Sequence, residues 1–318
     1  YMSQCPYYYN MMLLNKYIQI NNNMIFTNMM LSYNKKLCRD EIKQTTETSL
    51  ENNSVNLVLD SQNNDNIPKN FRKSSTILNT QNNKDLNLIG LITLNISGSQ
   101  QFSGNNLPIL IKSINTSSPI TIIDLRQESH GFINELPVSW ANAKNDANIG
   151  LTKNQVMLDE YTKLSNIKLN VPLTFYNHKN ITIIPTKVED EDHLVNSKSL
   201  SYNRITVTDG KIPKDDMVDY FVNLVISQPK NSWFHFHCKQ GIGRTTTFMI
   251  MYDMIKNSDK VTAGDIIERQ LLLANFDESH IKSFNNNERI NFLNEFYKYC
   301  KENKIGRASC RERVFAGC

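Results

Sequence analysis

Cys238, in a short glycine-containing loop, is the residue whose neighbours best equip it for chemistry. The loop reads His237-Cys238-Lys239-Gln240-Gly241-Ile242-Gly243-Arg244-Thr245. An apolar run that predicts a strand precedes it, and a segment that predicts a helix follows. The first backbone N–H groups of a helix have no intrahelical partner, and the helix dipole adds positive potential there. Because Gly241 and Gly243 lack a Cβ atom, the backbone can bring these N–H groups close to an anion. Residues 239–244 are therefore predicted to form a phosphate-binding loop.

A cysteine at the mouth of such a loop predicts nucleophilic catalysis. The helix N-terminus and a nearby guanidinium stabilise the thiolate, which is the reactive form of the side chain. Arg244 can support the thiolate and grip phosphate oxygens with its planar fork. Thr245 can donate a hydrogen bond to the sulfur when the sulfur becomes the leaving group. The expected reaction is in-line attack of Cys238 on phosphorus, followed by hydrolysis of the phosphocysteine by water.

Expulsion of an alkoxide also requires a proton donor, and a carboxylic acid on a nearby loop is the usual group. Asp209 is the best candidate, because it lies just before a helix in a loop that could close over a substrate. The alternatives are Asp215, Asp216, Asp190 and Asp192. An arbitrary Asp near Gly and Pro more often serves as a turn residue or helix cap, so spacing alone leaves the choice open.

Short apolar runs predict strands around this loop, and amphipathic runs predict helices. The expected strands are 88–94, 120–123, 181–184 and 233–237. The expected helices are 215–226, 245–255 and 263–273, with a last amphipathic helix that ends at Lys304. Strands that alternate with helices predict an α/β fold with a central, mostly parallel sheet flanked by helices.

The two ends of the chain are expected to lie outside this phosphatase domain, which is predicted to span 56–304. Residues 1–55 are rich in Asn, Met and Tyr and lack periodicity, which indicates a disordered or non-native leader. Residues 305–318 resemble the translation of a sequencing adapter. The six cysteines form no CxxC pair and no regular spacing, so we expect no zinc site, no disulfide framework and no cofactor.

Composition narrows the choice of partners. The net charge of +4 comes without a basic block, which argues against nucleic-acid binding. The sequence contains no run of 18 apolar residues, so no membrane-spanning helix is expected. A small polyphosphorylated molecule fits this mild positive charge, through local potential around the loop. The composition leaves the oligomeric state open.

Several segments, in order along the chain, resemble the protein-tyrosine-phosphatase-like (PTP-like) phytases, the cysteine phytases of bacteria. They are 95–103, 124–132, 137–140, 147–150, 202–209, 237–253 and 265–270. The resemblance covers about residues 66–303. It implies a phosphatase α/β fold with a small β-barrel-like subdomain inserted within about residues 90–190.

The implied reaction is metal-free, stepwise hydrolysis of phosphomonoesters of myo-inositol polyphosphates. Cys238 would be the nucleophile, Arg244 the phosphate binder and Asp209 the general acid. Location, secreted or periplasmic as in many relatives or cytoplasmic, stays open.

The chain departs from the family pattern at two places. Gly210 follows the expected general acid where the family usually has His, and Lys144-Asn145-Asp146 replaces a usual Arg-Asp-Trp run. The first change is expected to alter how the acid is positioned. The second is expected to alter substrate affinity or the preference among phosphates.

Further candidates for a substrate pocket are His130, Lys144 and Arg126, with Lys239 in the loop itself. Each of the first three also has a structural alternative. His130 can hydrogen-bond locally, and Lys144 can be a solvated surface residue. Arg126 can form an ion pair with Glu128 or Asp124. His237 is expected to brace the loop rather than to transfer protons.

Three other functions compete with the leading one. A tyrosine or dual-specificity phosphoprotein phosphatase uses the same loop but needs a deeper pocket and a phenol-stacking aromatic, for which Tyr176 and Tyr202 are the candidates. The second alternative is a phosphate-binding module with impaired catalysis. It is compatible with Gly210, which replaces the usual His after the expected general acid. A thiol redox protein ranks last, because Cys238 has no resolving cysteine nearby in the sequence.

Overall fold

A computed structural model describes residues 54–62, 64–79, 85–229 and 231–303. The chain divides into two units, Tyr1–Asn52 and Asn53–Cys318, and the described residues all belong to the second. Except for residues 54 and 55, the expected leader and the expected adapter-derived end fall outside the described residues. Within those residues, no helix has the length and apolar character needed to cross a bilayer.

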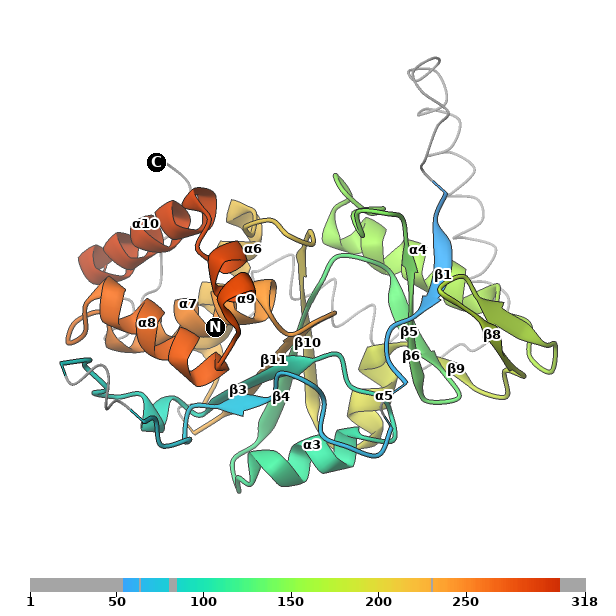
Figure 1. Ribbon diagram of the computed structural model, residues 1–318, viewed down its shortest axis with the longest axis horizontal. Coiled ribbons are helices and arrows are strands. Elements are labelled where there is room, and N and C mark those ends of the chain that lie inside the picture. The colour runs from blue at the N-terminus through green and yellow to red at the C-terminus, as the bar shows by residue number, and fades with distance from the viewer. Residues whose placement is uncertain (1–53, 63, 80–84, 230, 304–318) are drawn as a thin grey trace, which may run out of the picture. The chain divides into compact units, whose positions relative to one another are not determined.

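A five-stranded sheet forms the centre of this unit (Figure 1). In spatial order its strands are β10 (Ser201–Val207), β4 (Ile120–Arg126), β11 (Trp233–Cys238), β3 (Ile96–Gln100) and β2 (Arg72–Lys73). The first four are parallel, and β2 pairs antiparallel with β3. Every residue of β4 and β11 is buried, as is typical of parallel strands covered on both faces. The predicted α/β fold with a mostly parallel central sheet is confirmed.

Helices cover the two faces of the central sheet and bury separate hydrophobic cores (Figure 1). One core contains side chains of α3 (Leu107–Ile114) and α5 (Glu191–Ser197). The other is formed by α6 (Asp215–Ser227), α7 (Gly243–Asn257), α8 (Ala263–Ala274), α9 (Glu278–Phe284) and α10 (Asn287–Asn303). Helix α7 is buried along nearly its whole length, because it packs against β11, α8 and α10. The helix that follows the loop is therefore fixed in the core.

A second, antiparallel sheet has the order β1-β6-β5-β9. Its strands are β1 (Asn56–Leu59), β6 (Leu136–Ala141), β5 (His130–Ile133) and β9 (Val188–Glu189). The hairpin of β7 (Leu173–Phe175) and β8 (His178–Ile183) packs Phe175 against Val138 of this sheet. Helix α4 (Lys153–Ser165) starts at a capping box formed by Thr152 and Gln155. The second sheet thus combines β1, from residues 56–59, with strands from residues 130–189, and the inserted, barrel-like subdomain stays a prediction.

The expected helices at 215–226, 245–255 and 263–273 are confirmed as α6, α7 and α8, within two residues at each end. The expected strands at 120–123 and 233–237 lie in β4 and β11, and 181–184 overlaps the end of β8. The expected strand at 88–94 is wrong. Its apolar residues form a turn and a 3₁₀ helix, Ile92–Leu94, because Leu91 and Leu94 are buried three residues apart. The strand of this region, β3, begins only at Ile96.

Candidate active site

The predicted phosphate-binding loop lies at the carboxyl ends of the parallel strands, where α/β sheets usually bind their ligands. Cys238 is the last residue of β11, and α7 begins at Gly243. The neighbouring strand β4 ends two residues before Glu128, and β10 ends two residues before Asp209. Three strands thus bring the expected nucleophile, a carboxylate and the expected general acid to the same edge of the sheet.

Hydrogen bonds from outside the loop hold its carbonyl groups on one side. The pairs are Gln101 N with Lys239 O (3.5 Å), Asn70 Nδ2 with Gln240 O (2.8 Å) and Arg72 Nη1 with Gly241 O (2.6 Å). In a trans peptide the N–H of the next residue points opposite to the carbonyl. The N–H groups of residues 240–242 therefore point away from these donors, as a loop that binds an anion requires.

The two loop glycines differ in what they contribute. Gly241 has a φ of +73°, and a Cβ atom there would lie 2.3 Å from the backbone nitrogen of Gln100. No other residue fits without moving β3. A Cβ atom on Gly243 would meet its nearest atom, on Arg289, at an ordinary 3.6 Å. The expectation that both glycines are needed for close approach therefore applies to Gly241.

The sulfur of Cys238 is buried and accepts a hydrogen bond from Thr245, with Oγ1 3.2 Å from Sγ. This contact is the one expected from the sequence. A second cation, Arg72, also acts on the sulfur. Burial lowers the pKa of Arg72 to about 10, and the charge of Cys238 opposes that lowering. Arg72 has no carboxylate partner among the described residues, so its positive charge is left to favour the thiolate.

Arg244 is held by a bidentate ion pair with Glu128. Its Nη1 lies 2.7 Å from Oε2 and its Nη2 3.0 Å from Oε1, and Nη1 also donates to the carbonyl of Val207. Burial alone would lower the pKa of Arg244, but Glu128 and Cys238 raise it well above its usual value. The buried Nε of Arg244 has no hydrogen-bond partner among the described residues. The guanidinium is thus oriented by Glu128 with one donor unused.

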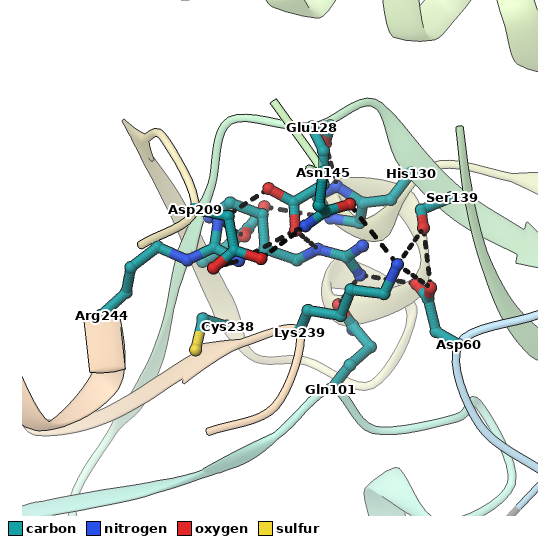
Figure 2. A network of polar contacts seen from close by, with 12 residues as sticks. Asp60, Gln101, Glu128, His130, Ser139, Asn145, Asp209, Cys238, Lys239 and Arg244 are labelled. Atoms are coloured by element: carbon teal, nitrogen blue, oxygen red, sulfur yellow. Dashed lines mark hydrogen bonds and ion pairs between the residues drawn. The ribbon is translucent and has the colours of Figure 1, made fainter. Parts of the chain in front are cut away.

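Asp209 lies over Arg244 in the loop after β10, as Figure 2 shows. Its Oδ1 is 3.1 Å from Arg244 Nη2, and its Oδ2 accepts a 2.7 Å hydrogen bond from Asn145 Nδ2. The side chain is 37% exposed, which distinguishes it from the buried ions around it. Asp209 thus lies beside the expected phosphate binder, whereas the alternative Asp190 caps α5.

Lys239 connects the loop to the β subdomain. Its Nζ lies 3.2 Å from Asp60 Oδ1 and 3.2 Å from Ser139 Oγ (Figure 2). Asp60 directly follows β1 and is fully buried. Burial alone would raise the pKa of Asp60, but Arg126 and Lys239 lower it overall. Asp60 is therefore an anion that fixes the loop lysine.

Arg126 plays a structural part. Its side chain is fully buried and pairs with Glu128 at 2.9 Å and with Asp60 at 2.8 Å. The ion pair with Glu128 was one of the two alternatives, whereas the pairing with Asp60 was not anticipated. Arg126 therefore bridges Glu128 and Asp60 inside the protein.

His130 lies in β5 and not in a loop, and it is buried among carboxylates. Its Nε2 is 3.2 Å from Asp124 and 3.3 Å from Glu191. Burial lowers the pKa of His130, but Asp124 and Glu160 outweigh that effect and raise it to about 9. The pocket position expected for His130 is thus replaced by a position in a buried ionic cluster.

The carboxylates and imidazole of Asp124, His130 and Glu191 lie close enough together to hold a metal ion. However, Arg204 Nε is 3.3 Å from Asp124, and His237 Nε2 is 2.6 Å from Glu191 Oε1. Arg204 already neutralises Asp124, and Glu191 is occupied by its contact with His237, so the group fits a polar network better than a metal centre. The contact of His237 agrees with the expected bracing role of this residue.

Two other candidates from the sequence have clear positions. Lys144 is exposed in the turn after β6, next to Asn145, which is compatible with either of its predicted roles. Tyr202 donates a 2.7 Å hydrogen bond to Asp124 and belongs to the packed sheet. Tyr176 is 61% exposed in the β7–β8 hairpin. Tyr202 is therefore unsuited to stack on a phenol ring.

The fold and this site match known proteins. The family model of the PTP-like phytases, described as inositol hexakisphosphate, matches residues 123–256. A PTP-like phytase from Bdellovibrio bacteriovorus is 32% identical with a TM-score of 0.67, over 83% of this chain and 95% of that one. The chain belongs to the PTP-like phytase family. The resemblance inferred from the sequence motifs is confirmed.

The chain covers only part of two further relatives. The PTP-like myo-inositol phosphatase from Mitsuokella multacida, solved with myo-inositol-(1,3,4,5)-tetrakisphosphate, is 31% identical with a TM-score of 0.70, over 84% of this chain and 49% of that one. Effector protein hopD2 of Pseudomonas syringae pv. tomato is 27% identical over 235 residues, 68% of this chain and 50% of that protein. The chain thus spans about half the length of each.

The sequence patterns did not single out several residues that the structure brings to the site. Arg72 and Asp60 come from short segments near the N-terminal limit of the domain, and Glu128 was considered only as a partner of Arg126. Asp60 follows the apolar run Leu57-Val58-Leu59, so a charged residue at the end of a short strand was the available signal.

Proposed function

We propose that this chain is a cysteine-dependent phosphatase that hydrolyses phosphomonoesters of myo-inositol polyphosphates through a phosphocysteine. One observation carries the proposal. The Cys238 sulfur, hydrogen-bonded by Thr245, lies at the start of a loop whose N–H groups face away from their anchoring donors, with Arg244 fixed beside it. This combination stabilises a thiolate and binds a dianion at the same place.

In the first step the Cys238 thiolate attacks phosphorus, and the bond to the leaving alkoxide breaks. Arg244 contributes its unused Nε, and its Nη2 exchanges the Asp209 carboxylate for a phosphate oxygen. Planar, bidentate recognition of the developing charge is what a guanidinium does best. Asp209, displaced from Arg244 and partly exposed, takes up a proton from solvent and gives it to the leaving oxygen.

In the second step water attacks the phosphocysteine, and sulfur leaves as a thiolate. Asp209, now ionised, accepts the proton of the attacking water. Thr245 donates to the sulfur at 3.2 Å and so stabilises the negative charge that returns to it. Inorganic phosphate is released, and the resting contacts of Asp209 can re-form.

A polyphosphorylated substrate is favoured by the cations around the loop. Lys239, at 21% side-chain exposure, and the exposed Lys144 are available to phosphates next to the one being cleaved. The Mitsuokella relative, which binds myo-inositol tetrakisphosphate, supports the same class of ligand. The similarity to hopD2 is compatible with an effector role for a chain of this kind.

The test compares Cys238→Ser with the unchanged protein on inositol hexakisphosphate, with products resolved by position. We expect hydrolysis to be lost and ligand binding to be retained, because serine keeps the loop but ionises too weakly to attack. Asp209→Asn should slow substrates with poor leaving groups most. Turnover of phosphotyrosine peptides with none of inositol hexakisphosphate would instead support the phosphoprotein phosphatase, and binding without any turnover would support the impaired module.

A further inference from the structure

Asn145 occupies a central position among the charged groups of the site. It lies in the turn between β6 and α4 with a φ of +56°. Its Nδ2 donates to Asp209 Oδ2 at 2.7 Å and to Glu128 Oε1 at 3.2 Å. Its Oδ1 faces Lys239 Nζ at 3.5 Å (Figure 2). One amide thus contacts the expected general acid, the carboxylate that holds Arg244 and the loop lysine.

The chemistry of these neighbours requires an amide with this orientation. Two carboxylates on one side need a donor, and an ammonium on the other side needs an acceptor. An Asp at this position, as in the Arg-Asp-Trp run of related sequences, would place a third carboxylate against Asp209 and Glu128. Asn145 avoids that repulsion and still tolerates the left-handed backbone.

Asp209 itself has few other restraints. It is followed by Gly210, which has a φ of +73° and no atom within 4 Å of the position of a Cβ. Its contacts among the described residues are with Arg244 and Asn145. Because a bound phosphate takes over the Arg244 donor, the hydrogen bond to Asn145 is the one that can persist during the reaction.

We propose that Asn145 is the positioning residue of the general acid Asp209, an inference that rests on the proposed phosphatase function. Asn145 holds Oδ2 by donating to it, so the catalytic proton is carried by Oδ1, the oxygen on the side of Arg244 and of the bound phosphate. In the first step the Oδ1–H bond breaks and the proton goes to the leaving alkoxide. In the second step Oδ1 takes a proton back from water.

The test uses Asn145→Gly, which removes the amide without straining a positive φ. The measured quantity is kcat/KM, which reports steps up to the phosphocysteine, for inositol hexakisphosphate and for p-nitrophenyl phosphate. The nitrophenolate leaves without a proton donor. We expect a loss of roughly tenfold for inositol hexakisphosphate and less than about twofold for p-nitrophenyl phosphate, because only the first needs an oriented acid. An equal loss for both substrates, or no loss, would overturn the proposal.

Two more variants keep the test decisive. Asn142→Ala is the matched control. Among the described residues the Asn142 side chain bonds to Asp146 within the same turn, and the Asn142 carbonyl that accepts from Asn145 N is kept, so the substrate ratio should stay unchanged. Asn145→Asp retains the size of the side chain and places a second carboxylate beside Asp209. The two carboxylates repel each other when both are ionised, so the pair should release its proton only at higher pH. We expect the alkaline limb of the kcat/KM profile to move up by about one pH unit. If the alkaline limb of the Asn145→Asp profile does not move, the proposal is contradicted. This test also remains available if Asn145→Gly fails to fold.

Failure of this inference differs from failure of the proposed function. If the unchanged protein hydrolyses neither substrate, or if Cys238→Ser remains active, the phosphatase assignment itself is wrong. If the unchanged protein hydrolyses both and Cys238→Ser neither, the assignment stands and the substrate ratio of Asn145→Gly alone judges Asn145.

Discussion

Asp60→Asn is the substitution that most directly tests the buried charges of the site. Asp60 has no exposed side-chain surface and accepts from Arg126 at 2.8 Å and from Ser139 at 2.7 Å, with Lys239 3.2 Å away. Asn preserves shape but removes the charge that both cations share. Removal of one partner of a buried ion pair costs about 3–5 kcal/mol, because the other charge stays buried and unpaired.

The lower part of that range applies to Asp60. Arg126 keeps Glu128 as a partner, and Lys239 is 21% exposed and can turn toward water. We therefore expect the free energy of unfolding to fall by about 3 kcal/mol at pH 7, roughly a hundredfold in the folding equilibrium. Urea unfolding, with the slope m compared to confirm that the same surface is exposed, measures this change.

The pH dependence gives the result an independent check. The pKa of Asp60 is lowered on folding, so its contribution is present above the unfolded pKa of 3.8 and is lost as pH falls through the folded pKa. The difference between Asp60→Asn and the unchanged protein should therefore shrink below pH 4. Glu295→Gln, in an exposed pair with Lys298, is the control and should change stability by less than about 0.5 kcal/mol. A loss for Asp60→Asn no larger than this control would refute the reasoning.

Two further predictions concern the loop and the core beneath it. Gly241→Ala should abolish phosphate release and lower the free energy of unfolding by at least about 2 kcal/mol, since its Cβ overlaps β3. Gly243→Ala, whose Cβ would make an ordinary contact with Arg289 at 3.6 Å, should leave stability nearly unchanged in the same urea assay. The pKa of His130 is raised from 6.5 to about 9, so its charge contributes stability fully below pH 6.5 and loses it as pH rises through 9. The free energy of unfolding should decline over that interval by up to about 3 kcal/mol, and His130→Gln should remove the decline; an equal slope in both proteins would contradict it.

The sequence predicted those parts of the site whose signal is local. Cys238, Gly241 and Arg244 lie within seven consecutive positions, and their strand and helix have strong apolar patterns. The contacts that orient these residues join distant segments. Glu128 lies 116 residues from Arg244, and Arg72 lies 169 from Gly241. Residue types within one window cannot report such pairings, because they depend on how β2, β3 and β4 are ordered in the sheet.

The two positions where the structure differs from the sequence-based expectation have the same origin. The run from Leu88 to Leu94 has the apolar character of a strand, but the core accepts Leu91 and Leu94 from a helical turn instead. His130 follows a predicted strand and looks like a loop residue, yet it begins β5 of the second sheet. In both cases tertiary packing decided between local alternatives that the sequence left nearly equal.

The buried charges of the site form an alternating chain whose ends are cations. They are Arg244, Glu128, Arg126, Asp60 and Lys239, and each is paired with the next. Each carboxylate of this series is shared by two cations, so the five ions carry one net positive charge. In the resting site the Asp209 carboxylate, 3.1 Å from Arg244, faces this charge (Figure 2). A phosphate that displaces Asp209 from Arg244 takes over the charge balance, whereas a neutral ligand cannot.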